Sequence, residues 1–270
     1  MVRRFFVVVA AVVAAAALLT APAQATGRGG YLALGDSVAF GYRPNAGADY
    51  LNAANFRGYA ENYAALRGLR LANASCPGET TGSMLTPGAP SNGCENGYRL
   101  AFPLHASYPG TQVAYAVDYL RAHPDTRLVT LTIGANDMFL CQRTTPDQCT
   151  GASFDAALAQ VSRNLEATLA AVRGHYRGDL VLVSYYSLDY RDQAQVKQVK
   201  ALDAALAKVT RRYHGRIADG FTAFRLASLR AGGDPCAAGL LIKLPAGGCD
   251  VHPSAAGHLA LTAALALAAH

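Results

Sequence analysis

Short apolar runs alternate along the chain with longer stretches in which apolar residues recur every three to four positions. The short runs predict buried strands at residues 31–34, 69–74, 127–133, 179–185 and 216–219. The periodic stretches predict helices over residues 58–69, 153–173 and 193–213 and from 255 to the C-terminus. We expect Ser153 and Ser254 to cap the second and the last of these helices. Alternating strands and helices predict a parallel sheet covered on both faces, which is an α/β fold.

The first residues have a different pattern. Arg3-Arg4 precede an apolar run from Phe5 to Leu19, and Ala23-Gln24-Ala25 fits the small-x-small cleavage rule. The alternative is a transmembrane anchor, but the run is short for a span and alanine is only weakly apolar. We therefore expect a cleaved signal peptide over residues 1–25 and a secreted, extracellular protein with one domain over residues 26–270.

Composition and charge narrow the class of protein. Half of the residues are apolar, which is enough for a sizeable core, and no repeat or linker divides the chain. Removing Arg3 and Arg4 lowers the formal net charge from +6 to +4, and the remaining lysines and arginines are scattered. We therefore expect no nucleic-acid partner. No second long apolar run follows the signal, so we expect no stable membrane insertion after cleavage, and a monomer is the default.

Six cysteines in an exported chain point to disulfides rather than to a metal. They fall into three local couples: Cys76 with Cys94, Cys141 with Cys149, and Cys236 with Cys249. Zinc is the alternative, but no Cys-x-x-Cys occurs and no histidine is suitably spaced, so we expect no metal site. Two of the couples lie in the long irregular stretches 75–110 and 231–250, which we expect to be ordered walls or lids of a site.

A serine follows the first predicted strand. Gly35 begins a turn that would lift the Ser37 hydroxyl out at the carboxyl edge of the sheet, where open α/β sheets bind ligands. Ser37 is a candidate nucleophile, and the alternative is an ordinary turn serine that caps the next helix. His252, on a short loop before Pro253, is the candidate base that would accept the Ser37 proton. Its alternative is a surface histidine near a helix start.

Three further residues have the chemistry that such a pair needs. Asp250 would hold the imidazole of His252 in the useful tautomer, or else it caps the loop or is simply solvated. Gly78, through its backbone N–H, and Asn136, through its side-chain amide, are candidate oxyanion donors, together with the N–H of Ser37 itself. The alternative for Asn136 is an Asx turn at the end of a strand.

These motifs resemble the four blocks of the SGNH (GDSL) hydrolase superfamily. The blocks are Gly35-Asp36-Ser37, Gly78, Gly134-Ala135-Asn136-Asp137 and His252-Pro253. The stretch 75–81 and the three cysteine couples are similar to its secreted actinobacterial lipase/esterase branch. The resemblance implies a flavodoxin-like three-layer α/β/α sandwich with about five parallel strands. It also implies ester hydrolysis through an acyl-serine intermediate, without metal or cofactor, with Ser37, Gly78, Asn136 and His252 in the roles given above.

One position departs from the family pattern. The acid of the last block usually lies three residues before the histidine, where this chain has Cys249, and Asp250 lies two before it. Some relatives lack the acid and orient the histidine with a backbone carbonyl. Either Asp250 or the carbonyl of Cys249 is therefore expected to orient His252.

The sequence predicts a secreted serine esterase or lipase that acts on small-molecule or lipid esters. An α/β-hydrolase version of the chemistry fits poorly, because no Gly-x-Ser-x-Gly elbow occurs. One alternative is a carbohydrate esterase that removes acetyl groups, although the chain has no tryptophan to form a sugar platform. The other alternative is an exported binding protein without turnover, against which the intact Ser37, Asn136 and His252 argue.

Overall fold

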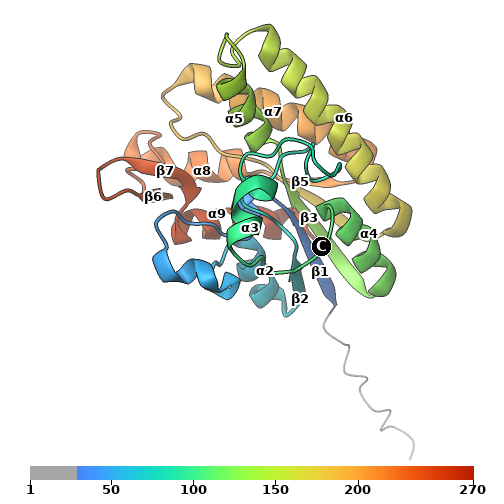
Figure 1. Cartoon of the computed structure of the whole chain (residues 1–270). Coiled ribbons are helices and arrows are strands. Elements are labelled where there is room, and N and C mark those ends of the chain that lie inside the picture. Colours follow the sequence, from blue (N-terminus) through green and yellow to red (C-terminus); the bar gives the residue numbers. More distant parts are fainter. Residues whose placement is uncertain (1–28) are drawn as a thin grey trace, which may run out of the picture.

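Five parallel strands form one sheet at the centre of the structure (Figure 1). The computed structural model describes residues 29–270, so the expected signal peptide over residues 1–25 lies outside the described residues. The strands run in the order β2-β1-β3-β4-β5, and every neighbouring pair is parallel. Their bounds are β1 Gly30–Gly35, β2 Arg70–Asn73, β3 Thr126–Thr132, β4 Asp179–Val183 and β5 Arg216–Ala218. Each predicted strand is confirmed to within two residues at either end.

The central strands are buried on both faces. All residues of β1 and all but one of β3 are buried, which is the continuous pattern of parallel strands that helices cover on both sides. The buried hydroxyls of Tyr31 on β1 and Thr130 on β3 lie 2.8 Å apart and hydrogen-bond to each other. These two polar groups inside the core therefore satisfy each other.

Helices cover both faces of the sheet and give three layers (Figure 1). In one layer α9 packs against α2 and α8, and in the other α6 packs against α4, α5 and α7. The bounds are α2 Tyr59–Arg67, α4 Gln112–Ala122, α5 Ala135–Thr144, α6 Ala152–His175, α7 Gln193–Arg212, α8 Gly220–Ser228 and α9 Ala255–Ala268. Shorter helical turns are α1 Ser37–Phe40, η1 Gly47–Leu51, η2 Ala53–Asn55, η3 Cys94–Tyr98, α3 Arg99–Ala101 and η4 Leu229–Ala231. The layers and the strand order confirm the expected flavodoxin-like sandwich.

The two predicted helix caps have different outcomes. Ser254 is the N-cap of α9, where its hydroxyl accepts a hydrogen bond from the N–H of Gly257 at 3.2 Å. The expectation that Ser153 caps α6 is wrong, because that helix begins at Ala152 and its N-cap is Gly151. The carboxylate of Asp147 accepts hydrogen bonds from the hydroxyl and the N–H of Ser153, so this serine ties the preceding loop to the first turn.

A two-stranded antiparallel sheet that the sequence pattern did not predict lies at the C-terminal end. β6 Leu241–Lys243 pairs with β7 Cys249–Pro253 inside and just after the stretch expected to be irregular. Helices α4, α5 and α8 were not predicted either. β7 carries both Asp250 and His252, so this small hairpin brings the last sequence block to the main sheet.

Three disulfides join the cysteine couples that are neighbours in sequence. Cys76 is bonded to Cys94, Cys141 to Cys149, and Cys236 to Cys249. The first ties η3 to the loop after β2, and the last ties β7 to the loop after η4. Among the helices of residues 29–270, none has the length and apolar character needed to cross a membrane.

Candidate active site

Ser37 lies at the carboxyl edge of the sheet, at the point where the strand order reverses between β1 and β3. Gly35 has φ +135°, and a Cβ there would lie 2.1 Å from the carbonyl oxygen of Thr132 on β3, so only glycine fits. Asp36 caps α1 by accepting a hydrogen bond from the N–H of Val38 at 2.9 Å. Ser37 therefore opens a short helix directly after the turn, with 9% of its surface exposed.

His252 comes from β7 and meets Ser37 across a long separation in sequence. Its Nε2 lies 2.9 Å from the Oγ of Ser37. Its Nδ1 is hydrogen-bonded to the carboxylate of Asp250, which also accepts the backbone N–H of His252 at 3.0 Å. Burial raises the pKa of Asp250, but the hydrogen bonds and the charge of His252 outweigh it and leave that pKa below its usual value. The three side chains form a continuous Ser–His–Asp chain with an ionised carboxylate.

The geometry distinguishes between the two groups expected to orient His252. The imidazole Nδ1 faces the carboxylate of Asp250, and within the described chain the carbonyl of Cys249 makes no hydrogen bond to it. Two bonds from one residue, to the ring and to the backbone N–H, fix both the position and the rotation of the imidazole. Asp250, despite its unusual spacing, is thus the group that contacts the imidazole Nδ1.

Tyr42 supports the imidazole from another side and was not singled out from the sequence. Its ring packs edge-on against His252, with 4.8 Å between the centroids. The Tyr42 hydroxyl lies 3.1 Å from that of Tyr50, which in turn donates to the carbonyl of Arg43 at 3.0 Å. The buried aromatic cluster around Phe40, the last residue of α1, therefore extends to the imidazole.

Gly78 and Asn136 line the same cavity as Ser37 and His252. Gly78 has φ +84°, and its N–H makes no hydrogen bond within residues 29–270. Asn136 lies in the first turn of α5 rather than in an Asx turn. Its Nδ2 is 3.4 Å from the carboxylate of Asp36, and its Oδ1 accepts a hydrogen bond of 2.6 Å from the Nδ2 of Asn92. The structure thus brings together all five residues proposed from the sequence.

Asp36 is a buried carboxyl directly beside this group. Burial raises its pKa to about 6, and hydrogen bonds from Tyr185 and from the N–H of Val38 oppose that rise. Tyr185, just after β4, donates its hydroxyl proton to Asp36 and accepts the N–H of Ala135 at 3.2 Å. Tyr185 therefore links β4, α1 and α5 behind the site, a role that no local pattern indicates.

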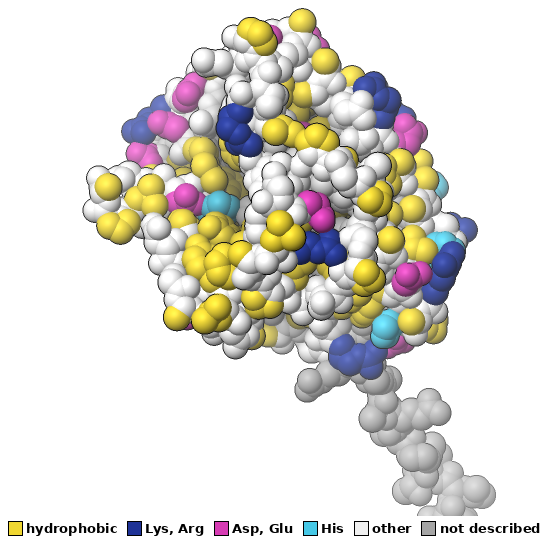
Figure 2. All heavy atoms as spheres, in the orientation of Figure 1, with side chains coloured by type: hydrophobic (Ala, Val, Ile, Leu, Met, Phe, Trp, Pro, Cys, Tyr) yellow, Lys and Arg dark blue, Asp and Glu magenta, His cyan; other side chains and the backbone are white. Residues whose placement is uncertain are grey.

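The cavity above Ser37 has a volume of about 950 Å³ and a largely apolar lining. Aromatic side chains from the first half of the chain form one wall: Tyr42, Tyr98 and Phe102. Side chains from α5, α6 and α7 form the other: Met138, Phe139, Phe154, Val199 and Leu202. Figure 2 shows this face of the molecule, where hydrophobic side chains gather around a hollow near its centre. Such a lining suits an apolar ligand.

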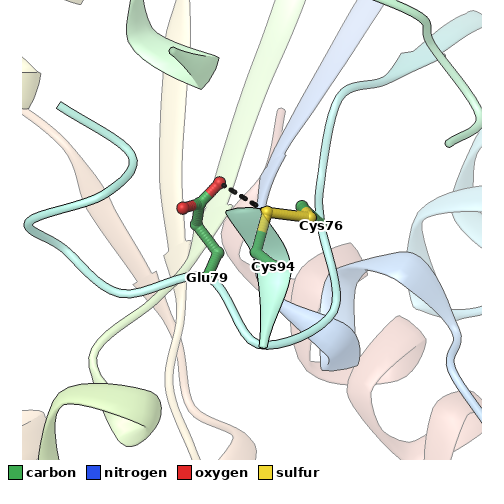
Figure 3. A group of neighbouring side chains, drawn as sticks. All are labelled: Cys76, Glu79 and Cys94. Carbon is green, nitrogen blue, oxygen red and sulfur yellow. Dashed lines mark hydrogen bonds between the residues drawn. A yellow bond between two sulfur atoms is a disulfide. The ribbon is translucent and has the colours of Figure 1, made fainter. Parts of the chain in front are cut away.

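Cys76, Glu79 and Cys94 form a compact buried group with metal-ligating atoms (Figure 3). Both sulfur atoms belong to one disulfide, so neither is free as a thiolate ligand. The Glu79 carboxylate accepts hydrogen bonds from Ser83 and, at 3.1 Å, from Gln112, and burial raises its pKa to about 7. The Gln112 amide also bonds both the N–H and the carbonyl of Gly35, so the group supports the turn before Ser37.

Comparisons with known proteins agree with this fold and these motifs. The chain matches the GDSL-like lipase/acylhydrolase family over residues 33–260, whereas no curated protein matches it. It is similar to phospholipase A1 from Streptomyces albidoflavus, with 20% identity, a TM-score of 0.58 and coverage of 90% of this chain and 100% of that one. A lipase from a goat rumen metagenome has 14% identity and a TM-score of 0.60, with 89% and 97% covered. An acetylxylan esterase from Geobacillus stearothermophilus has 17% identity and a TM-score of 0.54, with 88% and 92% covered.

At these identities the solved structures support the fold alone, and the family match carries the assignment. That match begins inside β1, before Ser37, and ends inside α9, after His252, so it includes every sequence block and most of the chain. The protein therefore belongs to the GDSL-like lipase/acylhydrolase family of hydrolases.

Proposed function

We propose that the protein is a serine esterase or lipase that hydrolyses carboxylic esters through an acyl-serine intermediate. The observation that carries the proposal is the hydrogen-bonded chain from Ser37 through His252 to Asp250 at the wall of a large apolar cavity. A serine hydroxyl is a weak nucleophile until a neighbouring base accepts its proton, and the Nε2 of His252 is within reach of that proton.

The reaction proceeds in two halves. Ser37 Oγ attacks the ester carbonyl while its proton passes to Nε2 of His252, and the tetrahedral intermediate collapses when the imidazolium protonates the leaving alcohol. Water then gives its proton to His252 and attacks the acyl carbon, and Ser37 recovers its proton as the carboxylic acid leaves. Asp250 stabilises the imidazolium in both halves, which its lowered pKa supports.

Each tetrahedral intermediate has a negative oxygen that needs fixed donors. The N–H of Gly78, the Nδ2 of Asn136 and the N–H of Ser37 are the donors in this proposal. Gly78 and Asn136 both line the cavity next to Ser37, and the Gly78 N–H has no hydrogen-bond partner within the described chain. A free, positioned N–H is the form that an oxyanion donor takes before substrate binds.

The cavity favours an ester with a long or bulky apolar group. An acetyl group would fill a small part of about 950 Å³, whereas an extended acyl chain would contact both the aromatic wall and the wall of α5, α6 and α7. An acetyl esterase of carbohydrates is the second candidate, and it has the support of the fold likeness to an acetylxylan esterase. The apolar lining and the absence of tryptophan weigh against it.

We also propose that the protein is exported and works outside the cytoplasm, as a member of the secreted actinobacterial branch of its family. All six cysteines are paired in three disulfides, a state that oxidising compartments maintain. Mass spectrometry of the protein recovered from the culture medium tests the export and the cleavage after residue 25 together.

Ser37→Ala tests the chemistry. We expect kcat/KM for p-nitrophenyl esters to fall about 10⁴-fold or more, as when other serine hydrolases lose their nucleophile. A fluorophosphonate should add its mass to Ser37 in the wild type and not in the variant. Ser162→Ala is the matched control, because that hydroxyl bonds a carbonyl of its own helix and does not line the cavity. Unchanged hydrolysis by Ser37→Ala would overturn the proposal.

A substrate series separates the two candidate substrates. Acetate, octanoate and palmitate p-nitrophenyl esters and an acetylated xylan are assayed with the wild type. We expect kcat/KM to rise from acetate to octanoate because the longer chain buries more of the apolar walls. The highest rate on the acetylated xylan would favour the carbohydrate esterase instead.

A further inference from the structure

We propose that Asn92, held by Arg143, is a positioning residue that fixes which end of the Asn136 side-chain amide faces the oxyanion. Neither residue belongs to a sequence block of the site. The inference deepens the proposed function and depends on it, because it assigns a task to the same oxyanion hole.

Asn92 contacts both residues that the proposal names as oxyanion donors beyond Ser37. Its backbone N–H donates to the carbonyl of Gly78 at 2.8 Å, and its Nδ2 donates to the Oδ1 of Asn136 at 2.6 Å. A Cβ on Gly78 would lie 2.6 Å from the carbonyl oxygen of Asn92, so the two backbones are in close contact. One residue therefore links the loop after β2 to the start of α5.

Arg143 determines the direction of these bonds. Its guanidinium donates to the Oδ1 of Asn92, and a guanidinium has donors only. The oxygen of the Asn92 amide must therefore face Arg143, which leaves its NH₂ group to face Asn136. The Asn136 oxygen must then accept that bond, and its own NH₂ group is turned the other way.

The contact of Asn136 with Asp36 agrees with this orientation of the Asn136 amide. Its Nδ2 lies 3.4 Å from the carboxylate of Asp36, which accepts one of the two N–H groups. The second N–H remains for the oxyanion. A flipped amide would instead present an oxygen to the developing negative charge, and would replace an attraction by a repulsion.

The surrounding structure holds Asn92 in this place. Asn136 and Arg143 lie on the same face of α5, about two helical turns apart, so Asn92 can bridge them. The disulfide from Cys94, two residues after Asn92, to Cys76, two residues before Gly78, joins the two ends of the connection between β2 and η3 (Figure 3). Asn92 therefore connects helix α5 to a stretch of chain that the Cys76–Cys94 disulfide holds in place.

Asn92→Asp is the decisive variant. It keeps the size of the side chain, the contact with Arg143 and the backbone N–H, but a carboxylate accepts and cannot donate. The Asn136 amide then loses its donor and is drawn toward the flipped state. We expect kcat to fall about 10–100-fold, approaching the loss of a whole oxyanion donor, with KM within about threefold and an unchanged melting temperature.

Arg143 is exposed, so its side chain can be replaced with little effect on the core, and its variants test the positioning of Asn92 independently. Arg143→Lys keeps a donor toward Asn92 and should retain activity to within about threefold. Arg143→Glu presents an acceptor, so the Asn92 amide turns around and Asn136 follows, and kcat should fall about tenfold below that of the lysine variant. Equal kcat values for these two variants would contradict the inference even if Asn92→Asp fails to fold.

A double-mutant cycle separates positioning from the effect of a new charge. In an Asn136→Ala background, Asn92→Asp should cost less than about twofold in kcat, because the amide that it positions is absent. Asn96→Asp adds the same charge at an exposed site of the same segment and should leave kcat unchanged. Equal losses in both backgrounds, or a wild-type kcat for Asn92→Asp, would overturn the inference.

The outcomes also separate this inference from the proposed function. Wild-type activity in Asn136→Ala would overturn the positioning role and leave the Ser37 chemistry standing. Wild-type activity in Ser37→Ala would overturn the proposed function itself.

Discussion

Among single residues, Asp250 raises the sharpest question, because its spacing from His252 departs from the family pattern while its geometry is that of a triad acid. Its carboxylate bonds the ring and the backbone of the same histidine. β7 explains how this is possible: side chains two positions apart on a strand project to the same side. An acid two residues before the histidine therefore reaches it within one strand.

Asp250→Asn tests whether this carboxylate is required. The amide keeps the shape but favours the wrong imidazole tautomer and cannot stabilise the imidazolium, so we expect kcat/KM to fall about 10³–10⁴-fold. The measurement is hydrolysis of a p-nitrophenyl ester from pH 5 to 9. A loss of only a few-fold would transfer the orienting role to the carbonyl of Cys249. Asp234→Asn, in the preceding loop and outside the cavity lining, is the control.

Tyr42 makes a second prediction about the imidazole. Tyr42→Phe keeps the edge-on ring beside His252 and should retain activity to within about twofold. Tyr42→Leu removes the ring, and we expect kcat to fall about fivefold to tenfold, since such aromatic contacts contribute about 0.5–1.5 kcal/mol. Steady-state kinetics of both variants check this, and equal activity of the two would show that the ring does not position His252.

The residues that sequence analysis found are those with a local signature. Ser37 follows a strand and a glycine turn, and Asn136 and His252 each lie in a short block. Tyr42, Asn92 and Tyr185 have no such signature, because each acts on a partner brought near by the fold. Their roles follow from contacts between distant segments, which a single sequence does not contain.

At the scale of elements, β1, β3 and β4 were predictable because each holds a run of apolar or β-branched residues, whereas β2 and β5 are short stretches in which apolar and polar residues mix. β6 and β7 were not predictable, since β6 has only three residues and β7, although it alternates over Cys-Asp-Val-His, is short and follows a glycine-rich loop. The start of α5 was missed because Gly134-Ala135-Asn136-Asp137 has the composition of a turn. Hydrogen bonds from Thr81 to Asp137, at 2.9 and 2.6 Å, instead fix this segment as the first turn of a helix.

The disulfide between Cys236 and Cys249 leads to a prediction about β7. Replacing both cysteines by alanine frees the start of the strand that carries Asp250 and His252, so we expect kcat to fall several-fold. The free energy of unfolding should fall by about 2–3 kcal/mol, as expected for a loop of this size. The matched control replaces Cys141 and Cys149, which also form a local disulfide but are not on β7. The variant without Cys141 and Cys149 should also lose free energy of unfolding, but it should keep more of its kcat than the variant without Cys236 and Cys249.

At the scale of the whole molecule, four carboxyls link stability to pH, of which Asp36 and Glu79 are buried and Asp137 and Asp203 are half-buried. Burial raises the pKa to about 6 for Asp36 and Asp137, and to about 7 for Glu79 and Asp203. The native state therefore binds protons more tightly at these groups than the unfolded chain does. Their contribution is most favourable near pH 4, becomes less favourable as the pH rises to about 7, and is constant above that. Asp250, with a lowered pKa, acts in the opposite direction at lower pH.

Asp203 is the group that isolates this effect. Its Oδ1 accepts the N–H of Tyr185 at 3.0 Å, while its buried Oδ2 has no hydrogen-bond partner in residues 29–270. Asp203→Asn keeps the acceptor for Tyr185 and removes the buried charge. We expect the free energy of unfolding at pH 8 to rise by about 1–3 kcal/mol, since one unit of pKa shift corresponds to about 1.4 kcal/mol.

The comparison of two pH values determines whether the buried charge is the cause. At pH 4 the Asp203 carboxyl is protonated in the native state, so the asparagine variant and the wild type should melt at nearly the same temperature. The difference in melting temperature between the two proteins should appear between pH 4 and 7, because the pKa of Asp203 is about 7 in the native state and lower in the unfolded chain. Asp118→Asn, at a site where 78% of the side chain is exposed, should leave the curve unchanged. A stabilisation of Asp203→Asn that is equal at both pH values would instead assign the gain to packing or helix propensity, and would leave the unpaired carboxylate without an energetic role.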